Sequence, residues 1–268
     1  MFNRFLSTLS LVSRFPIKRS GIEPFDVSRS DFYLPITGIV PALLGVLVLC
    51  GGFFLTKSPL LTVILTLIGQ YLGFNLFHLD GLIDTADAFL GTFDREKRLT
   101  VLKDSRIGVY GFFAGIGVLS LKAGLLYTLF PWLLRFPAPL LAYPISGRFS
   151  AALIPALTGP AKPGGLGALV QDARPYRVMA GLVTGLLLWT VLIGGMGVLL
   201  AINEPCRGLS GLLYAVPLAS PLVSVFFTRL YRKHLGGYTG DALGAAVEIA
   251  EILHLLSSLL VLRWINVS

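Results

Sequence analysis

Aspartates gather in one short stretch of this sequence at a spacing that could hold a divalent cation. Four of the nine Asp residues in the chain lie within the fifteen positions 80–94. A helix turns 100° per residue, so Asp80, Asp84 and Asp87 would fall within about 60° of one another. The segment reads His78-Leu-Asp80-Gly-Leu-Ile-Asp84-Thr-Ala-Asp87-Ala-Phe-Leu-Gly91-Thr-Phe-Asp94.

Three carboxylates on one helix face repel one another unless a cation neutralises them. Carboxylate oxygens are hard ligands that suit Mg²⁺ or Mn²⁺, and these ions keep several waters and often bind substrate phosphates as well. We therefore predict a Mg²⁺ site with Asp80, Asp84 and Asp87 as ligands. The alternative is a solvated acidic face just beyond the end of a membrane helix. The position of the cluster directly after an apolar span favours the metal site.

Two further motifs carry carboxylates beside small or basic residues. In Lys103-Asp104-Ser105-Arg106-Ile-Gly108, the carboxylate could be a metal ligand or a general base, and the two cations could hold phosphate oxygens. The alternative is a helix N-cap flanked by interfacial cations. In Gly236-Gly237-Tyr238-Thr239-Gly240-Asp241, the last residue suits an N-cap. We also treat Asp104 and Asp241 as candidate catalytic carboxylates.

Other charged residues are candidates for anion binding or for packing inside the membrane. Arg148, Lys162 and Arg174 are candidate substrate contacts. Glu248 and Glu251 lie in an apolar stretch, where ionisable groups are costly, so we expect them to line the same cytoplasmic cavity as the aspartates. If 242–264 lies flat on the membrane instead, they face water. Lys122 is expected to snorkel toward the outer surface. His78 would lie opposite the Asp face of an ideal helix.

The composition indicates that membrane helices position these residues. The chain has 268 residues, of which 54% are hydrophobic and 13% are charged, against about 25% charged in soluble domains. A chain dissolved in lipid must satisfy its backbone in helices, so we predict an all-α polytopic bundle. The net charge of +8 comes with no aromatic-studded basic stripe, which excludes a nucleic-acid partner and favours anionic membrane lipid or an anionic substrate.

Hydropathy predicts six to seven transmembrane helices, since a span needs about 20 apolar residues. A further helix over residues 1–12 suits the membrane interface, because its apolar residues recur at helical spacing. No repeat or linker divides the chain, so we expect one domain, 1–268, and the sequence leaves a homo-oligomer open. The expected spans are 32–55, 59–79, 107–130, 137–158, 178–201, 209–229 and a more polar seventh, 242–264.

The distribution of Lys and Arg predicts the orientation in the membrane. The N-terminal segment, the long connectors 80–106, 159–177 and 230–241, and Arg229 at the start of the last connector together hold sixteen of these residues, whereas the short connectors hold three. Basic residues accumulate on the cytoplasmic side. We therefore expect the N-terminus and the long connectors, which carry the candidate site, to face the cytoplasm from the inner membrane. Cys50 and Cys206 have no metal-binding spacing.

The motifs resemble those of the cobalamin synthases, the adenosylcobinamide-GDP ribazoletransferases. The similar segments occur in the order of that family and span most of the chain. They are Ser13-Arg14-Phe15-Pro16, His78-Leu-Asp80-Gly-Leu-Ile-Asp84-Thr-Ala-Asp87, Lys103-Asp104-Ser-Arg106-Ile-Gly108 and Gly240-Asp241-Ala-Leu-Gly244-Ala.

The resemblance implies a Mg²⁺-dependent membrane transferase of adenosylcobalamin biosynthesis. Such an enzyme joins α-ribazole, or its 5′-phosphate, to adenosylcobinamide-GDP and releases GMP. Phosphoryl transfer asks mainly for positioning and charge neutralisation, which metal-bridging carboxylates and nearby cations supply. One further carboxylate, Asp104 or Asp241, would take the proton of the attacking hydroxyl, while Lys103, Arg106 and Arg148 would steady the departing phosphate.

Two alternatives remain. The first is a lipid-headgroup transferase similar to the CDP-alcohol phosphotransferases, which use clustered Asp residues on membrane helices. The spacing of four residues between Asp80 and Asp84, and the absence of Ala-Arg after Gly81, argue against it. The second is an ion-coupled transporter, which would carry polar residues through both halves of the bilayer. In this sequence the polar residues are expected mainly in the cytoplasmic half, which argues against a transporter.

Overall fold

The computed structural model describes residues 2–13, 26–133, 136–162, 170, 172–199 and 212–267. Within these ranges the chain is helical and has no strand, which confirms the all-α class. One isolated bridge pairs Pro160 with Tyr238. Several residues of the sequence argument lie outside the described residues, namely Arg14, Phe15, Pro16 and Cys206.

Seven helical stretches are long and apolar enough to cross a membrane, so the seventh, more polar stretch also qualifies. The chain is therefore a multi-pass membrane protein. The candidate spans are Ser30–Thr56, Pro59–Leu90, Val109–Leu133, Pro137–Leu157, Pro175–Gly195, Leu212–Leu235 and Gly240–Trp264.

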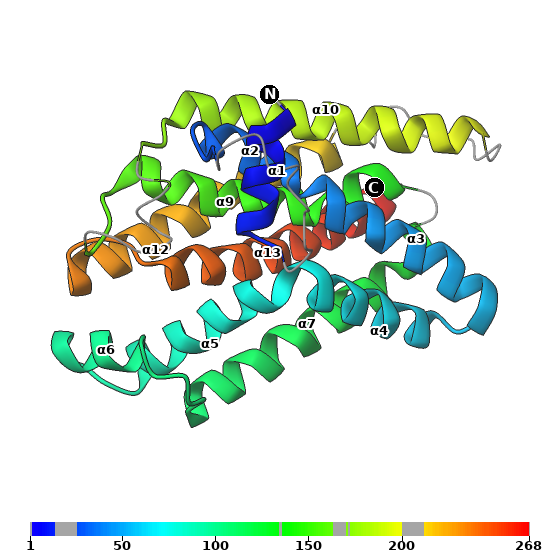
Figure 1. The fold of residues 1–268 in the computed structure, drawn as a ribbon. Helices are drawn as coiled ribbons and strands as arrows, with labels where there is room; N and C mark the ends of the chain where they lie inside the picture. The colour runs from blue at the N-terminus through cyan, green and yellow to red at the C-terminus, as the bar shows by residue number, and fades with distance from the viewer. Residues whose placement is uncertain are drawn as a thin grey trace.

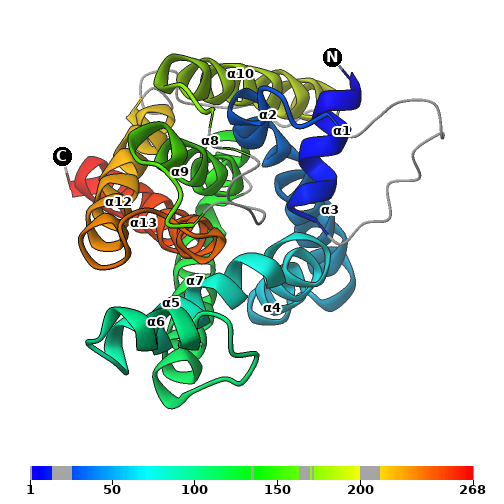
Figure 2. The same ribbon diagram turned by 60° about the vertical axis from the view of Figure 1, so that its left-hand side comes forward.

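The last helix lies in the middle of the bundle. Helix α13 (Gly240–Val267) packs against α5 (Leu76–Leu90), α7 (Val109–Leu133), α9 (Tyr143–Leu157) and α12 (Ser220–Leu235). Figures 1 and 2 show it between α9 and α12 on one side and α5 and α7 on the other. Its small residues Ala242, Ala245 and Ala246 are fully buried, which allows several helices to approach it closely.

The remaining helices form the outer parts of the bundle. Helix α2 (Ser30–Thr37) packs on α10 (Pro175–Leu199) and α9, while α3 (Ile39–Thr56) packs on α4 (Pro59–Gln70). Short elements complete the described fold, namely α6 (Arg95–Val101), α8 (Pro137–Leu140) and η3 (Val216–Ala219). Many large apolar side chains of the outer helices α3, α4 and α10 are exposed, as expected for a surface in contact with lipid.

The second span is one helix in three parts and is longer than the sequence predicted. A π-helical turn, η1 (Tyr71–Asn75), joins α4 to α5, and the Leu76 amide donates to the carbonyl of Tyr71. The connector expected at 80–106 therefore starts after Leu90. The aspartates of α5 lower the hydropathy of this segment. Leu79, Leu82 and Ala88 nevertheless pack into the core, so the helix continues through it.

The N-terminal helix α1 (Phe2–Leu11) does not run along the spans. It packs on α2 and lies across the long helices (Figures 1 and 2). Arg4 Nε donates to Asp26 Oδ2 at 2.7 Å, and the Asp26 amide donates to Ser7 Oγ at 3.3 Å. These contacts fasten α1 to the segment that precedes α2.

Candidate active site

Two glycines bring the Asp-rich helix against the last helix of the bundle. A Cβ atom on Gly81 would lie 2.9 Å from the carbonyl oxygen of Asp241, and one on Gly244 would lie 2.9 Å from that of His78. Only glycine allows the backbones of α5 and α13 to approach this closely. The contact brings Asp80 and Asp84 beside Asp241, from a motif about 160 positions away in the sequence.

The carboxylates at this contact interact with one another electrostatically, and no described Lys, Arg or His forms an ion pair with them. Asp84 interacts electrostatically with Asp80, Asp241 and Asp87. Asp80 is exposed, and Asp84 and Asp241 are half-buried. Thr239 Oγ1 donates to Asp241 Oδ2 at 3.0 Å. The side chains of Asp80 and Asp84 form no hydrogen bond and no ion pair with any described residue.

This group of acidic side chains fits a cation that keeps part of its own water shell. Within the described ranges, no three His, Cys, Asp or Glu side chains already converge as a complete metal site. Mg²⁺ commonly binds through one or two carboxylates together with water and substrate phosphates. Unneutralised like charges at one contact match that kind of site better than a closed cage of protein ligands.

Asp87, the third predicted ligand, is held by the start of α7. Its Oδ2 accepts from the Gly108 amide and its Oδ1 from the Gly111 amide, both at 2.8 Å. The first amides of a helix lack intrahelical partners, and a negative charge there is favourable. A Cβ atom on Gly108 or Gly111 would overlap this carboxylate. Asp87 thus joins α5 to α7 as well as lying near Asp84.

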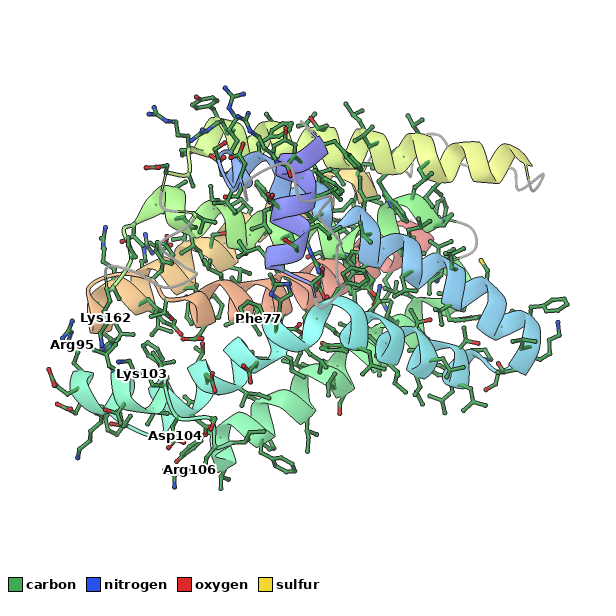
Figure 3. All side chains as sticks on the ribbon, viewed as in Figure 1. Phe77, Arg95, Lys103, Asp104, Arg106 and Lys162 are labelled. Atoms are coloured by element: carbon green, nitrogen blue, oxygen red, sulfur yellow. The ribbon has the colours of Figure 1, made fainter. Side chains whose placement is uncertain are left out.

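Asp104 and Arg106 bind each other on the connector between α6 and α7. Arg106 Nη2 and Asp104 Oδ2 are 2.6 Å apart, and the Arg106 side chain is 88% exposed. The hydrogen bond from Arg106 lowers the pKa of Asp104 to about 2. Lys103 is exposed beside them, and Figure 3 shows all three toward the same end of the molecule.

Lys162 lies where two connectors are tied together. The Ala161 amide donates to the Tyr238 carbonyl at 2.8 Å, and the Tyr238 amide donates to the Gly159 carbonyl at 3.0 Å. This bridge brings Lys162 to the connector that leads into Asp241, and Figure 3 shows its exposed side chain at the same end of the bundle as Lys103.

Arg174 lies near the other end of the connector 159–177, just before α10. Its backbone amide donates to Asp31 Oδ2 at 2.8 Å, and its side chain is exposed. Asp31 is also paired with Arg177 at 2.9 Å. The segment before α10 is therefore fastened to the first turn of α2.

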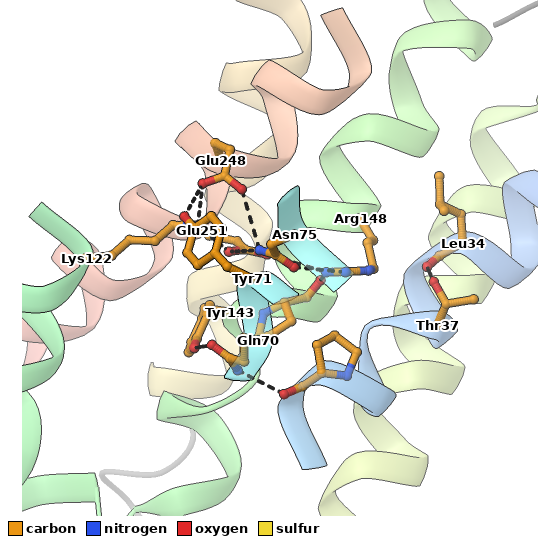
Figure 4. A network of polar contacts seen from close by, with 12 residues as sticks. Leu34, Thr37, Gln70, Tyr71, Asn75, Lys122, Tyr143, Arg148, Glu248 and Glu251 are labelled. Carbon is orange, nitrogen blue, oxygen red and sulfur yellow. Dashed lines mark hydrogen bonds and ion pairs between the residues drawn. The ribbon is translucent and has the colours of Figure 1, made fainter. Parts of the chain in front are cut away.

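A second charged group lies deeper in the bundle and corrects two expectations (Figure 4). The expected snorkelling of Lys122 is wrong, because its side chain is fully buried and its Nζ lies 2.6 Å from both Glu248 and Glu251. The expectation that these glutamates line the polar cavity is also wrong, since both are 0% exposed. Charges inside a span are costly alone, and here they neutralise one another.

Arg148 belongs to this deeper group. Its Nη1 lies 3.4 Å from Glu251 Oε1, and its Nη2 donates to Asn75 Oδ1 at 3.2 Å. Glu251 is ten residues beyond Asp241 on the same helix, or about 15 Å at 1.5 Å per residue. Arg148 is thus brought together with Glu251 and not with the acidic group around Asp84.

Several uncharged residues of this network were not identified from the sequence. Tyr71 Oη donates to Glu248 at 2.6 Å, Asn75 Nδ2 donates to Glu251 at 3.0 Å, and Gln70 Nε2 donates to the Pro41 carbonyl at 2.8 Å. Tyr143 donates to the side chain of Gln70. Gln70 and Asn75 are polar amides within an apolar span, and that feature could have indicated them.

Comparisons with known proteins give a consistent result. A family model described as cobalamin-5-phosphate synthase matches residues 4–259. Among similar proteins, an adenosylcobinamide-GDP ribazoletransferase of Pseudomonas putida is 32% identical over 92% of this chain and 95% of its own. Proteins of the same name from Azorhizobium caulinodans and Clostridioides difficile are 31% and 29% identical, over 96% and 94% of this chain and 95% of each of theirs. No solved structure matches the chain.

Proposed function

The chain belongs to the cobalamin-5-phosphate synthase family, and from that membership we propose that it is an adenosylcobinamide-GDP ribazoletransferase. The reaction joins α-ribazole, or its 5′-phosphate, to adenosylcobinamide-GDP and releases GMP, in the last steps of adenosylcobalamin formation. The observation that supports this proposal is the group of carboxylates around Asp84, where α5 meets α13, with which no described Lys, Arg or His forms an ion pair.

The acidic group suits a phosphoryl transfer that depends on Mg²⁺. Bound Mg²⁺ would neutralise the charge on the pyrophosphate and on the departing GMP. Asp80 and Asp84 would hold the ion, because their side chains have no other polar partner among the described residues. Asp87 would complete the acidic face while its oxygens hold the start of α7.

The attacking group is a hydroxyl of the ribazole. A bond forms between this oxygen and the phosphorus on the cobinamide side of the pyrophosphate, the bond from that phosphorus to the GMP oxygen breaks, and the hydroxyl proton passes to a carboxylate. Asp241 suits this last role better than Asp104 does. Asp104 is held as an anion by Arg106 at a pKa of about 2, which makes it a weak base.

Exposed cations at the same end of the molecule would bind the phosphates. Lys103, Arg106 and Lys162 lie toward one end of the molecule (Figure 3), and Arg174 is a further exposed cation in the connector before α10. Arg148, bound to Glu251 and Asn75, is better suited to holding α9 against α13 than to contacting GMP. We propose that this end faces the cytoplasm from the inner membrane, as the excess of Lys and Arg in the long connectors indicates.

Release of GMP by purified protein in lipid nanodiscs tests the proposal. GMP should form only when adenosylcobinamide-GDP, α-ribazole and Mg²⁺ are all present, and EDTA should abolish it. Asp80→Asn should remove activity, whereas Glu96→Gln, an exposed carboxylate on α6, should not. No GMP from folded wild-type protein over a range of lipids and metals would contradict the assignment.

A further inference from the structure

A small apolar cavity adjoins the contact between α5 and α13. Its volume is about 50 Å³, more than the roughly 10–15 Å³ that one water needs. The wall formed by α13 includes Gly240 and Gly244, which flank Asp241. Helices α1, α2 and α9 close the other sides, and α5 contributes Phe77 and His78. The cavity therefore lies next to the carboxylate that we assign as the proton acceptor.

His78 presents an unsatisfied imidazole to this cavity. The residue is 4% exposed, and neither ring nitrogen has a hydrogen-bond partner among the described residues. The other buried histidine is different, since His254 Nδ1 lies 2.7 Å from Ser146 Oγ and its Nε2 lies 2.9 Å from the Pro139 carbonyl. Buried polar side chains are nearly always hydrogen-bonded, so an exception calls for a missing partner.

The chemistry of the cavity limits what that partner can be. The polar side chains of the wall are Thr8, Ser30 and His78, and the hydroxyl of Thr8 already donates to the Arg4 carbonyl at 2.8 Å. A corrinoid is far too large for this space. Guanine presents several donors and acceptors on its edges and would leave most of them unpaired. A flat, mostly apolar heteroaromatic ring with one ring nitrogen fits the lining.

We propose that His78 determines specificity for the ribazole by hydrogen-bonding the ring nitrogen of its heteroaromatic base, whose edge enters this cavity. The inference rests on the proposed transferase function. A base held here by its inner edge leaves its sugar on the side of Gly240 and Gly244, beside Asp241. The imidazole does not react; it positions the acceptor and rejects bases that lack a matching nitrogen.

Steady-state kinetics on the full-length protein in nanodiscs, with each substrate varied in turn, tests the inference. His78→Phe keeps an aromatic ring but removes the hydrogen bond, and it should raise the KM for α-ribazole about tenfold, as expected for one buried hydrogen bond. The KM for adenosylcobinamide-GDP should not change. His78→Gln, which keeps a hydrogen-bonding group, should restore most of the affinity.

Two further variants separate a ligand contact from a role in packing. Ala151→Leu narrows the cavity from α9 and should also raise the KM for α-ribazole. His254→Asn changes a buried histidine that is already satisfied, and it should lower stability without changing the ratio of the two KM values. If His78→Phe and Ala151→Leu leave the KM for α-ribazole unchanged, or raise both KM values equally, the inference is wrong.

Direct binding keeps this test independent of turnover. Equilibrium dialysis of α-ribazole against wild-type protein and His78→Phe, without the second substrate, should show about tenfold weaker binding in the variant. Equal binding by the two proteins would overturn the role of His78 even if GMP is released normally. Absence of GMP release together with His78-dependent binding would instead count against the proposed reaction alone.

Discussion

Replacing Lys122 with Met should destabilise the bundle strongly, because it removes one of the two cations that neutralise the buried Glu248 and Glu251. Lys122 Nζ makes three polar contacts, at 2.6 Å to Glu248, 2.6 Å to Glu251 and 3.0 Å to Tyr71. Polar contacts between membrane helices contribute about 0.6 kcal/mol each, which gives roughly 2 kcal/mol for three. Removing one partner of a buried ion pair costs about 3–5 kcal/mol. We therefore expect a loss of about 2–5 kcal/mol.

A compensating change makes the reasoning specific to charge. The network holds two cations, Lys122 and Arg148, and two anions, Glu248 and Glu251. Lys122→Met leaves one uncompensated negative charge, and adding Glu248→Gln restores neutrality. The double variant should thus be more stable than Lys122→Met alone, by about 1 kcal/mol or more.

Unfolding by SDS in mixed micelles provides the assay. Fluorescence of the fully buried Trp189, whose Nε1 donates to the Ala138 carbonyl at 2.7 Å, reports loss of the native packing. Lys97→Met, at an exposed position on α6, should stay within about 0.5 kcal/mol of wild type. A Lys122→Met protein as stable as that control, or a double variant whose losses simply add, would refute the charge-balance argument.

Three further outcomes are expected at the acidic group. Asp84→Asn should lower kcat for GMP release about 10³-fold, from loss of a metal ligand and of the charge that it supplies, whereas an unchanged kcat would exclude Asp84 as a ligand. Gly81→Ala places a methyl group 2.9 Å from the Asp241 carbonyl, so it should cost about 1–3 kcal/mol of stability and most of the activity, while Gly124→Ala, with open space around it, should cost neither. Asp104→Asn should leave the shape of the pH–rate profile between pH 5 and 7 unchanged, because a group whose pKa is lowered to about 2 is ionised throughout that range; a changed profile would make Asp104 the base.

Hydropathy was sufficient to predict the spans, and residue spacing was sufficient to predict that Asp80 and Asp84 share a surface. Hydropathy failed at the end of the second span, where the same acidic residues that mark the site also make a buried helix resemble a connector. The hydrogen bonds to Asp87 could not be predicted in this way, because its partners are backbone amides, which every residue except proline carries.

The buried ion network was beyond sequence reasoning for a different reason. Lys122 and Glu248 are separated by 126 positions, and a charge within one span gives no information about which other helix carries its partner. The polar residues of each helix could be recognised individually as unusual. Their pairing depends on how α5, α7, α9 and α13 meet, which only the folded bundle shows.

The π-helical turn at Tyr71–Asn75 fixes the rotational phase of everything that follows it in the second span. One extra residue in a turn rotates the rest of a helix by about 100° relative to an uninterrupted α-helix. Deleting a single residue from this turn would keep every side chain of α5 and its length, yet would rotate Asp80 and Asp84 away from Asp241. This short stretch should therefore tolerate many substitutions on its lipid-facing side but almost no change in its number of residues.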